Sequence, residues 1–183
     1  MTNTTRKTAT DCVDFWASAG FEKWFTKDAD FDEEFRRHFL DLHFAAARRE
    51  HDDWIESPQG ALALMILLDQ FPRNVFRGTG HMFATDPLAR MYARMAIEKG
   101  HDQAVDEMLR AFFYLPFEHS EDIGDQELSV RLFNALGGEW TKYSDEHQEI
   151  IVRFGRFPHR NPALGRQSTP EELTFLEEGG FSG

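Results

Sequence analysis

Residues 57–71 read SPQGALALMILLDQF, and this stretch decides the fold class. Ser57 followed by Pro58 is typical of a helix start, because a serine side chain caps free backbone N–H groups and proline fits the first turn. Every position from 61 to 68 is apolar. A helix that is apolar on most sides is expected to lie in the middle of a protein.

Helical periodicity continues on both sides of this stretch. Residues 31–50 place apolar side chains at three- and four-residue spacings, the pattern of an amphipathic helix: Phe31, Phe35, Phe39, Leu42 and Ala46. Further helices are predicted over residues 86–99, 102–114, 125–136 and 144–154, with a last short one after Thr169. Strand-like alternation of apolar and polar residues is scarce. The sequence therefore predicts an all-α protein.

Three apolar–proline pairs divide the chain at regular intervals. They are Phe71-Pro72, Leu115-Pro116 and Phe157-Pro158, so the prolines are 44 and 42 residues apart. Each pair is expected to end a helix, because proline disfavours helical geometry in the residue before it. A polar loop and two further helical segments follow each pair, which predicts helix-turn-helix units with a period of about 43 residues. We expect one such domain over residues 11–183, after a disordered segment at residues 1–10.

Composition excludes several classes of protein. The chain has 183 residues, of which 20 are Lys or Arg and 32 are Asp or Glu, giving a net charge of −12. This acidic balance argues against binding to nucleic acid or an anionic membrane. The single cysteine, Cys12, excludes an internal disulfide and a thiolate zinc cage. The sequence shows no signal peptide and no membrane-spanning stretch, so a cytoplasmic location is expected.

Arginines gather in two acid-free windows despite this charge. Residues 150–169 contain Arg153, Arg156, Arg160 and Arg166 with His159, and residues 70–85 contain Arg73 and Arg77. Arginine binds carboxylate or phosphate through two parallel hydrogen bonds, so these loops predict an anion site if they converge. The alternative is that these arginines pair with carboxylates of neighbouring units, namely Asp69, Glu118, Glu121 or Asp122, and join the repeats.

Residues 118–122, EHSED, follow the second proline and offer a general acid or base. Glu118 could orient His119, whose pKa ordinarily lies near neutrality. The alternative is that Ser120 caps the next helix, with Glu121 and Asp122 in its first turn. No histidine or cysteine spacing matches a metal motif, so no metal is predicted, and no phosphate loop or cofactor motif is present.

Several longer motifs resemble a known family: VDFW at 13–16, LLDQFPRNVFRGT at 67–79, LPFEHSED at 115–122 and RFGRFPHRNPALGRQSTPEE at 153–172. The chain is similar over nearly its whole length to the bacterial domain-of-unknown-function family 924. The resemblance implies a tetratricopeptide-like α-α superhelix and no known activity. The residues that the charge pattern selects as candidates for ligand binding also lie in these motifs. They are Asp69, Gln70, Arg73, Asn74, Arg77, Glu118, His119, Arg156, His159, Arg160, Asn161 and Arg166.

Three functions are compatible with these patterns. The first is a binding module that holds an anionic small ligand or peptide terminus in a pocket lined by Arg, Asn and His. The second is a hydrolase or transferase in which His119 or His159, oriented by Glu118 or Asp69, moves a proton. The third is a purely structural polar cluster, with function elsewhere, for example at a homo-oligomer interface.

Overall fold

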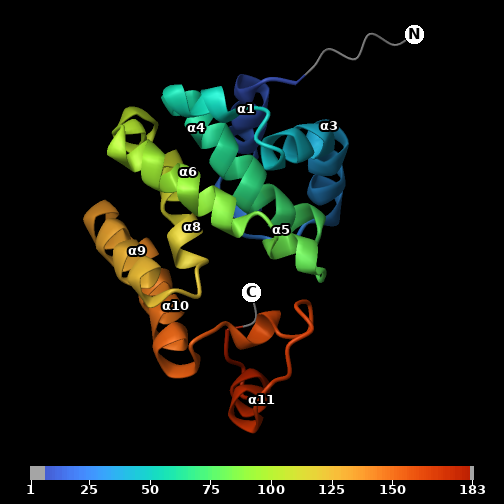
Figure 1. Cartoon of the computed structure of the whole chain (residues 1–183), viewed down its shortest axis with the longest axis vertical. Helices are drawn as coiled ribbons and strands as arrows, with labels where there is room; N and C mark the ends of the chain where they lie inside the picture. Colours follow the sequence, from blue (N-terminus) through green and yellow to red (C-terminus); the bar gives the residue numbers. More distant parts are fainter. Residues whose placement is uncertain (1–6, 182–183) are drawn as a thin grey trace. The chain divides into compact units, whose positions relative to one another are not determined.

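The computed structural model describes residues 7–181, and within that range it contains helices and no strand (Figure 1). The predicted all-α class is confirmed. The chain divides into two compact units, which we treat separately. The first unit comprises Met1–Arg77 and His81–Pro116, and the second comprises Gly78–Gly80 and Phe117–Gly183. No helix among the described residues is long and apolar enough to cross a membrane.

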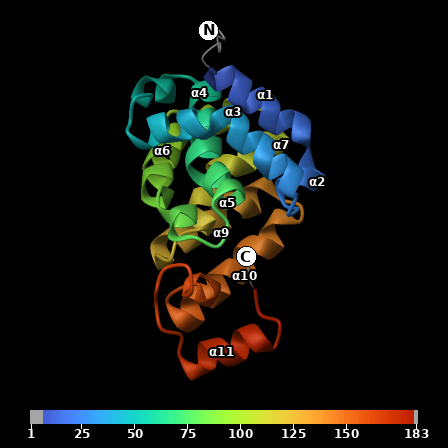
Figure 2. The same cartoon turned by 90° about the vertical axis from the view of Figure 1, so that its right-hand side faces the viewer.

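The core of the first unit is the apolar stretch that decides the fold class. Helix α4 (Pro58–Met65) packs against α1 (Ala9–Ala19) and α6 (Asp86–Glu98), and α5 (Phe71–Val75) packs against α3 (Ala29–Ala47). Helices α1 and α3 lie side by side, because the ring of Phe15 stacks on Phe31 and Phe35 at 5.3 Å (Figure 2). The elements of this unit are α1 (Ala9–Ala19), α2 (Phe21–Trp24), α3 (Ala29–Ala47), η1 (Asp52–Glu56), α4 (Pro58–Met65), η2 (Ile66–Gln70), α5 (Phe71–Val75), η3 (Gly80–Phe83), α6 (Asp86–Glu98), η4 (His101–Ala104), α7 (Glu107–Arg110) and η5 (Ala111–Phe113).

Helix starts follow the predicted chemistry in this unit. The Ser57 side chain accepts a hydrogen bond from the Gly60 N–H, and Pro58 occupies the first turn of α4. In α3 the predicted apolar positions are all buried. At the chain start α1 begins at Ala9 after a capping box at Thr8, within the segment expected to be disordered. Residues 1–6 of that segment lie outside the described range.

The prediction that Phe71-Pro72 ends a helix is wrong. Helix α4 continues into the π-helix η2 and then α5, so Pro72 lies inside one helical run from Pro58 to Val75. The Phe71 N–H bonds to Ile66 O, five residues back. Because Pro72 has no N–H, it cannot satisfy Leu68 O in an α-turn or Leu67 O in a π-turn. Side chains do so instead: Thr85 Oγ1 donates to Leu68 O at 2.5 Å, and His43 Nδ1 donates to Leu67 O at 2.8 Å.

The hydrogen bond from Thr85 to Leu68 O therefore helps this helix to accommodate Pro72. We expect Thr85→Val, which keeps the shape and removes the hydroxyl, to lower the free energy of unfolding by about 1–2 kcal/mol, because it leaves a buried carbonyl without a donor. Urea denaturation measures this change. Thr26→Val is the matched control, since Thr26 makes the same kind of bond to Glu22 O on the surface, where water can replace it. Equal losses in both variants would contradict this account.

The segment before the second proline pair also differs from the prediction. Instead of one helix over residues 102–114, the chain forms η4, α7 and η5 in succession. Pro116 then lies in the short α8 (Leu115–Glu118), where the boundary between the units falls. A buried hydrogen bond from the Tyr114 hydroxyl to Asp102 Oδ2, 2.7 Å long, connects the two ends of this segment. Here tertiary contacts outweigh helix propensity.

The second unit is built on α9 (Ile123–Leu136) and α10 (Trp140–Phe154), followed by η6 (Pro158–Arg160) and α11 (Pro170–Glu177). Gly155 ends α10 with a φ of 68°, a left-handed value that suits glycine, and Phe157-Pro158 follows outside the helix as predicted. Thr169 forms a capping box with Glu172 at the start of α11. Ile150, Ile151 and Phe157 form a buried cluster in this unit, on which Phe154, Phe175 and Phe181 pack.

Candidate functional site

The first polar cluster surrounds the π-helix of the first unit. Arg73 makes a forked pair with Asp86, with Nη1 to Oδ1 at 2.8 Å and Nη2 to Oδ2 at 3.0 Å. Its Nη1 also lies 3.1 Å from Asp69 Oδ1. The side chains of Arg73, Asp69 and Asp86 are only 12%, 1% and 7% exposed. Burial lowers the pKa of Arg73, but the two carboxylates raise it more, so the guanidinium stays charged.

The remaining candidates of this loop are also occupied by the chain itself. Asn74 Nδ2 donates to Asp32 Oδ1 at 2.8 Å, and Arg77 Nε donates to Asp32 Oδ2 at 2.9 Å. Gln70 Nε2 donates to Asp69 Oδ2 at 2.6 Å. Arg73, Asn74 and Arg77 therefore connect this helical run to α6 and α3, and Gln70 supports Asp69 within the π-helix.

Two histidines lie behind the π-helix. His43 is fully buried, and its Nδ1–H is used on Leu67 O, so its Nε2 is a bare acceptor 3.0 Å from His81 Nε2. The pKa of His43 is lowered to about 4, mainly by burial. The hydrogen bond to Leu67 O raises this pKa, and His81 lowers it. No group of three or more His, Cys, Asp or Glu side chains suited to a metal ion occurs among residues 7–181.

In the second unit, Arg166 closes the loop that follows Pro158. Its Nη1 and Nη2 donate to both carboxylate oxygens of Glu121, at 2.7 and 2.9 Å, and its Nε donates to Asn161 Oδ1 at 2.9 Å. Glu121 Oε1 also accepts the Phe157 N–H at 2.8 Å. Burial raises the pKa of Glu121, but these hydrogen bonds and the charge of Arg166 lower it more, so the carboxylate stays ionised.

Arg156 pairs with Glu172 at the start of α11. Its Nε and Nη2 donate to the two carboxylate oxygens at 2.5 and 2.8 Å. Glu172 also accepts the Thr169 N–H at 2.7 Å and Asn161 Nδ2 at 3.2 Å. The hydrogen bonds from Arg156 are the main reason that the pKa of Glu172 falls to about 2, against the effect of burial.

A group of three histidines lies beside this loop, and we call it the histidine cluster: His119, His147 and His159. The rings of His119 and His147 are 6.5 Å apart, and His147 and His159 both contact the rings of Phe157 and Phe181. His147 Nδ1 bonds to Tyr143 O at 2.8 Å and lies 3.8 Å from Glu118 Oε1. Glu118 therefore lies beside His147, a residue outside the sequence-predicted candidates.

His159 is the unusual member of the cluster. Its Nδ1 is buried and has no hydrogen-bond partner within the described structure. The pKa of His159 is lowered to about 3, mainly by burial. The neighbouring Arg160, His147 and His119 also lower this pKa, and Glu121 raises it. Arg160 is itself buried, and its guanidinium lies 4.4 Å from the centre of the Phe157 ring. A neutral imidazole therefore lies next to a buried positive charge.

Ser120 is not the predicted helix cap. Its hydroxyl donates to Asp125 Oδ2 at 2.7 Å, and the cap of α9 is Asp122, which accepts the Asp125 N–H. Gln126 donates to the carbonyls of Glu118 and Ser120 at 2.7 and 2.6 Å, which fixes the backbone on both sides of His119. These bonds explain why the chain turns sharply here.

The sequence-predicted candidates thus fall into separate groups. The first unit contains Asp69, Gln70, Arg73, Asn74 and Arg77, and the second unit contains the other candidates. Convergence of all three loops on one site therefore stays a prediction. The residues that the sequence analysis missed are the distant partners, and no local pattern marks them: Asp32, His43, Thr85, Asp86, His147 and Phe181. Of the paired arginines, Arg166 and Arg73 have partners, Glu121 and Asp69, that the sequence analysis considered.

These features define an all-helical protein with internal ion-pair clusters in both units and a histidine cluster in the second. The chain belongs to the family described as "Bacterial protein of unknown function (DUF924)", which it matches over residues 12–180. It is similar to a solved structure of a protein of unknown function, ATU0120 from Agrobacterium tumefaciens, with 61% identity and a TM-score of 0.92. The match covers 93% of this chain and 97% of that one. A comparison with curated proteins found no relative.

Proposed function

We propose that this protein is a binding module, and that His159 and Arg160 hold the carboxylate or phosphate group of a small ligand or peptide terminus. The observation that carries this proposal is the buried Nδ1 of His159, which has no hydrogen-bond partner in the described structure. Leaving a buried polar atom without a partner costs about 1–3 kcal/mol, and such atoms in native proteins call for an explanation. An anionic oxygen would accept a hydrogen bond from Nδ1–H and be attracted by Arg160.

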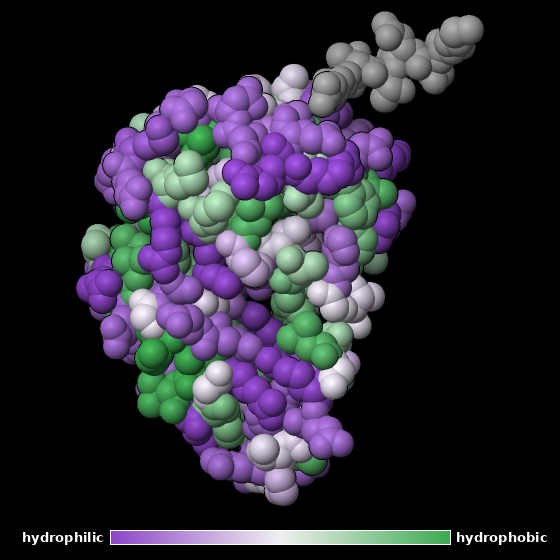
Figure 3. Space-filling model, viewed as in Figure 1, coloured by the Kyte–Doolittle hydropathy of each residue, from purple (hydrophilic) through white to green (hydrophobic). Residues whose placement is uncertain are grey.

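Arg160 enters the proposal through its positive charge next to His159, and four other arginines are left out of the proposed site because they pair with carboxylates of the chain. Arg73 pairs with Asp69 and Asp86, and Arg77 with Asp32. Arg156 and Arg166 pair with Glu172 and Glu121. The structural alternative therefore accounts for these four residues. The visible face in Figure 3 is largely hydrophilic, and the net charge of −12 disfavours polyanions, so a small ligand fits better than a nucleic acid.

Binding explains the histidine cluster better than catalysis does. A general acid or base works best when its pKa lies near the operating pH. The pKa of His159 is about 3, so its ring stays neutral near pH 7 and is a weak base. Of the two carboxylates named for orienting it, Glu118 lies beside another histidine of the cluster, His147, and Asp69 belongs to the first unit, where it accepts a hydrogen bond from Gln70.

Phosphate and acetate test this proposal at constant ionic strength. Imidazole resonances followed by NMR should show that either anion raises the pKa of His159 from about 3 toward 6.5, because a nearby negative charge favours the imidazolium. His147 should respond as a neighbour. Failure of both anions to perturb either histidine would reject the proposal.

The variant His159→Phe separates binding from folding. It keeps a ring at this position and removes the unpartnered nitrogen, so we expect its free energy of unfolding to stay the same or rise by about 1 kcal/mol. The response of His147 to phosphate and acetate should disappear. His38→Phe, in α3 of the first unit, is the control that should leave this response intact. An unchanged anion response in His159→Phe would place the site elsewhere.

A further inference from the structure

The chain itself fills the space beside the histidine cluster with an aromatic ring. The Phe181 ring lies edge-on to His147, with centroids 4.5 Å apart and planes at 62°, and to His159, at 5.2 Å and 74°. Phe157 contacts the same two histidines from its own position, at 5.5 and 5.7 Å. The cluster thus forms an aromatic slot for the Phe181 ring, with the rings of His147 and His159 as two of its walls.

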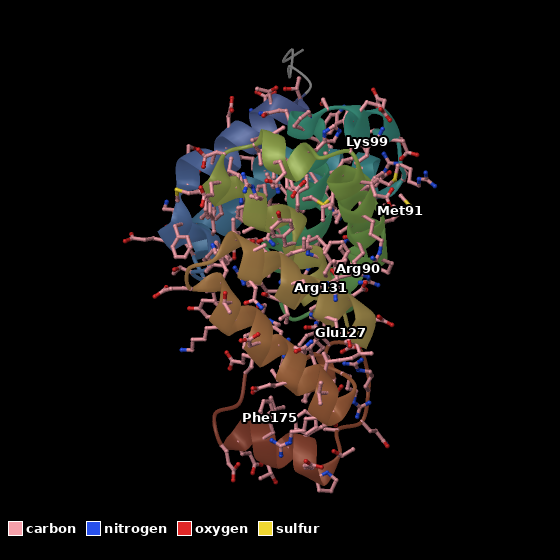
Figure 4. All side chains as sticks on the ribbon, turned by 90° about the vertical axis from the view of Figure 1, so that its left-hand side faces the viewer. Arg90, Met91, Lys99, Glu127, Arg131 and Phe175 are labelled. Atoms are coloured by element: carbon pink, nitrogen blue, oxygen red, sulfur yellow. The ribbon has the colours of Figure 1, made fainter. Side chains whose placement is uncertain are left out.

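The backbone that brings Phe181 to this slot is held by two glycines. Gly179 adopts a φ of 86° after the end of α11, and the Gly180 N–H donates to Phe175 O at 2.9 Å. A Cβ at Gly180 would lie 2.5 Å from that oxygen and 2.6 Å from the Phe175 ring, so only glycine fits. Phe175 lies on the side of α11 that faces α10, where its ring is 5.1 Å from that of Phe154 (Figure 4).

We infer that the ligand of this site carries an aromatic ring together with its carboxylate, and that its ring replaces the half-buried ring of Phe181 against His147 and His159. This inference rests on the proposed function and specifies its ligand class. Among the described residues, Phe181 makes ring contacts with His147 and His159 and packs on the buried cluster of the second unit, and the turn after α11 positions it. None of these contacts is an ion pair. The arriving ring would make the same edge-on contacts while its carboxylate reaches His159 Nδ1.

The test compares three probes with and without the Phe181 ring: phenylacetate, acetate and 2-phenylethanol. In Phe181→Ala, phenylacetate should bind at least about tenfold more tightly than in the wild-type protein, because no internal ring has to be displaced. Acetate should bind both proteins equally, and 2-phenylethanol should bind weakly because it has no charge. NMR titration of His147 and His159 provides all of these affinities.

A second variant keeps the test valid if Phe181→Ala destabilises the second unit. Gly180→Ala displaces the segment through the clash with Phe175 while the Phe181 side chain remains, and it should also favour phenylacetate. Phe25→Ala, at an exposed ring of the first unit, should change no affinity. A tripeptide that ends in phenylalanine separates the two sources of this chemistry: tighter binding than phenylacetate would assign a peptide terminus, and weaker binding a small acid.

The outcomes for the ligand class and for the function differ. If acetate and phosphate perturb His159 but phenylacetate gains nothing from Phe181→Ala or Gly180→Ala, the aromatic ligand class is wrong and the anion site stands. If no anion perturbs His147 or His159 in any of these proteins, the proposed function itself fails. If Phe181→Ala increases the affinity for acetate as much as the affinity for phenylacetate, the aromatic assignment is also wrong.

Discussion

We expect Arg73→Ala to lower the free energy of unfolding by about 3–5 kcal/mol, because it leaves two buried carboxylates without their counter-charge. Asp69 and Asp86 are 1% and 7% exposed, so water cannot replace the guanidinium. The variant also removes the hydrogen bond from Arg73 to Asp69 O, a carbonyl of the π-helix. Urea denaturation followed by circular dichroism measures the loss.

Two comparisons show whether burial is the cause. Arg77→Ala removes a pair in which the arginine is 34% exposed, and it should cost less than about 1 kcal/mol. Adding Asp86→Asn to Arg73→Ala removes one of the stranded charges, so the double variant should be more stable than Arg73→Ala alone. If Arg73→Ala and Arg77→Ala unfold alike, the cluster does not hold the unit together.

Much of the helical structure could be predicted, because local chemistry decides it. The apolar spacing in α3, the Ser57 cap of α4 and the Thr169 capping box of α11 act within a few residues of one another. Such signals are present in the sequence itself. The confirmed all-α class rests on these signals.

The proline pairs show where local chemistry is insufficient. Proline alone predicts a helix end at Phe71, and Gly155 together with Pro158 does end α10. At Pro72 the helix continues, because Thr85 and His43 supply the hydrogen bonds that proline cannot make. Thr85, in the turn before α6, is 17 residues from Leu68, and His43, on α3, is 24 residues from Leu67. Nothing in the sequence near the proline reveals them.

The candidate site follows the same rule. Charge composition selected the arginines as candidates, and ligand binding by them stays a prediction. Two of the carboxylates that pair with them lie far away in sequence: Asp32 is 45 residues from Arg77, and Glu121 is 45 residues from Arg166. An acid-free window is therefore equally compatible with arginines that pair with a distant carboxylate and with arginines that bind a ligand. The proposed site rests instead on the buried, unpartnered Nδ1 of His159, a property that is visible only in the structure.

Glu172→Gln is expected to have the second largest effect. The substitution keeps the shape of the side chain and removes its charge, so the forked pair with Arg156 and the bond from Thr169 weaken together. Glu172 is 2% exposed, while the Arg156 side chain is 27% exposed and can regain water after the loss. We therefore expect a decrease of about 2–3 kcal/mol in the free energy of unfolding near neutral pH, measured by thermal or urea denaturation.

The pH dependence distinguishes a charge effect from a packing effect. The pKa of Glu172 is about 2 in the folded protein and 4.5 ordinarily, so its ionised form favours folding. That stabilisation is complete above pH 4.5 and is lost as the pH falls through about 2. The difference between the wild-type protein and Glu172→Gln should therefore shrink from pH 5 downward. Glu171→Gln, whose partner Arg153 is exposed, should show almost no difference at any pH. A Glu172→Gln deficit that stays constant between pH 5 and pH 2 would mean that packing, and not the ion pair, secures the start of α11.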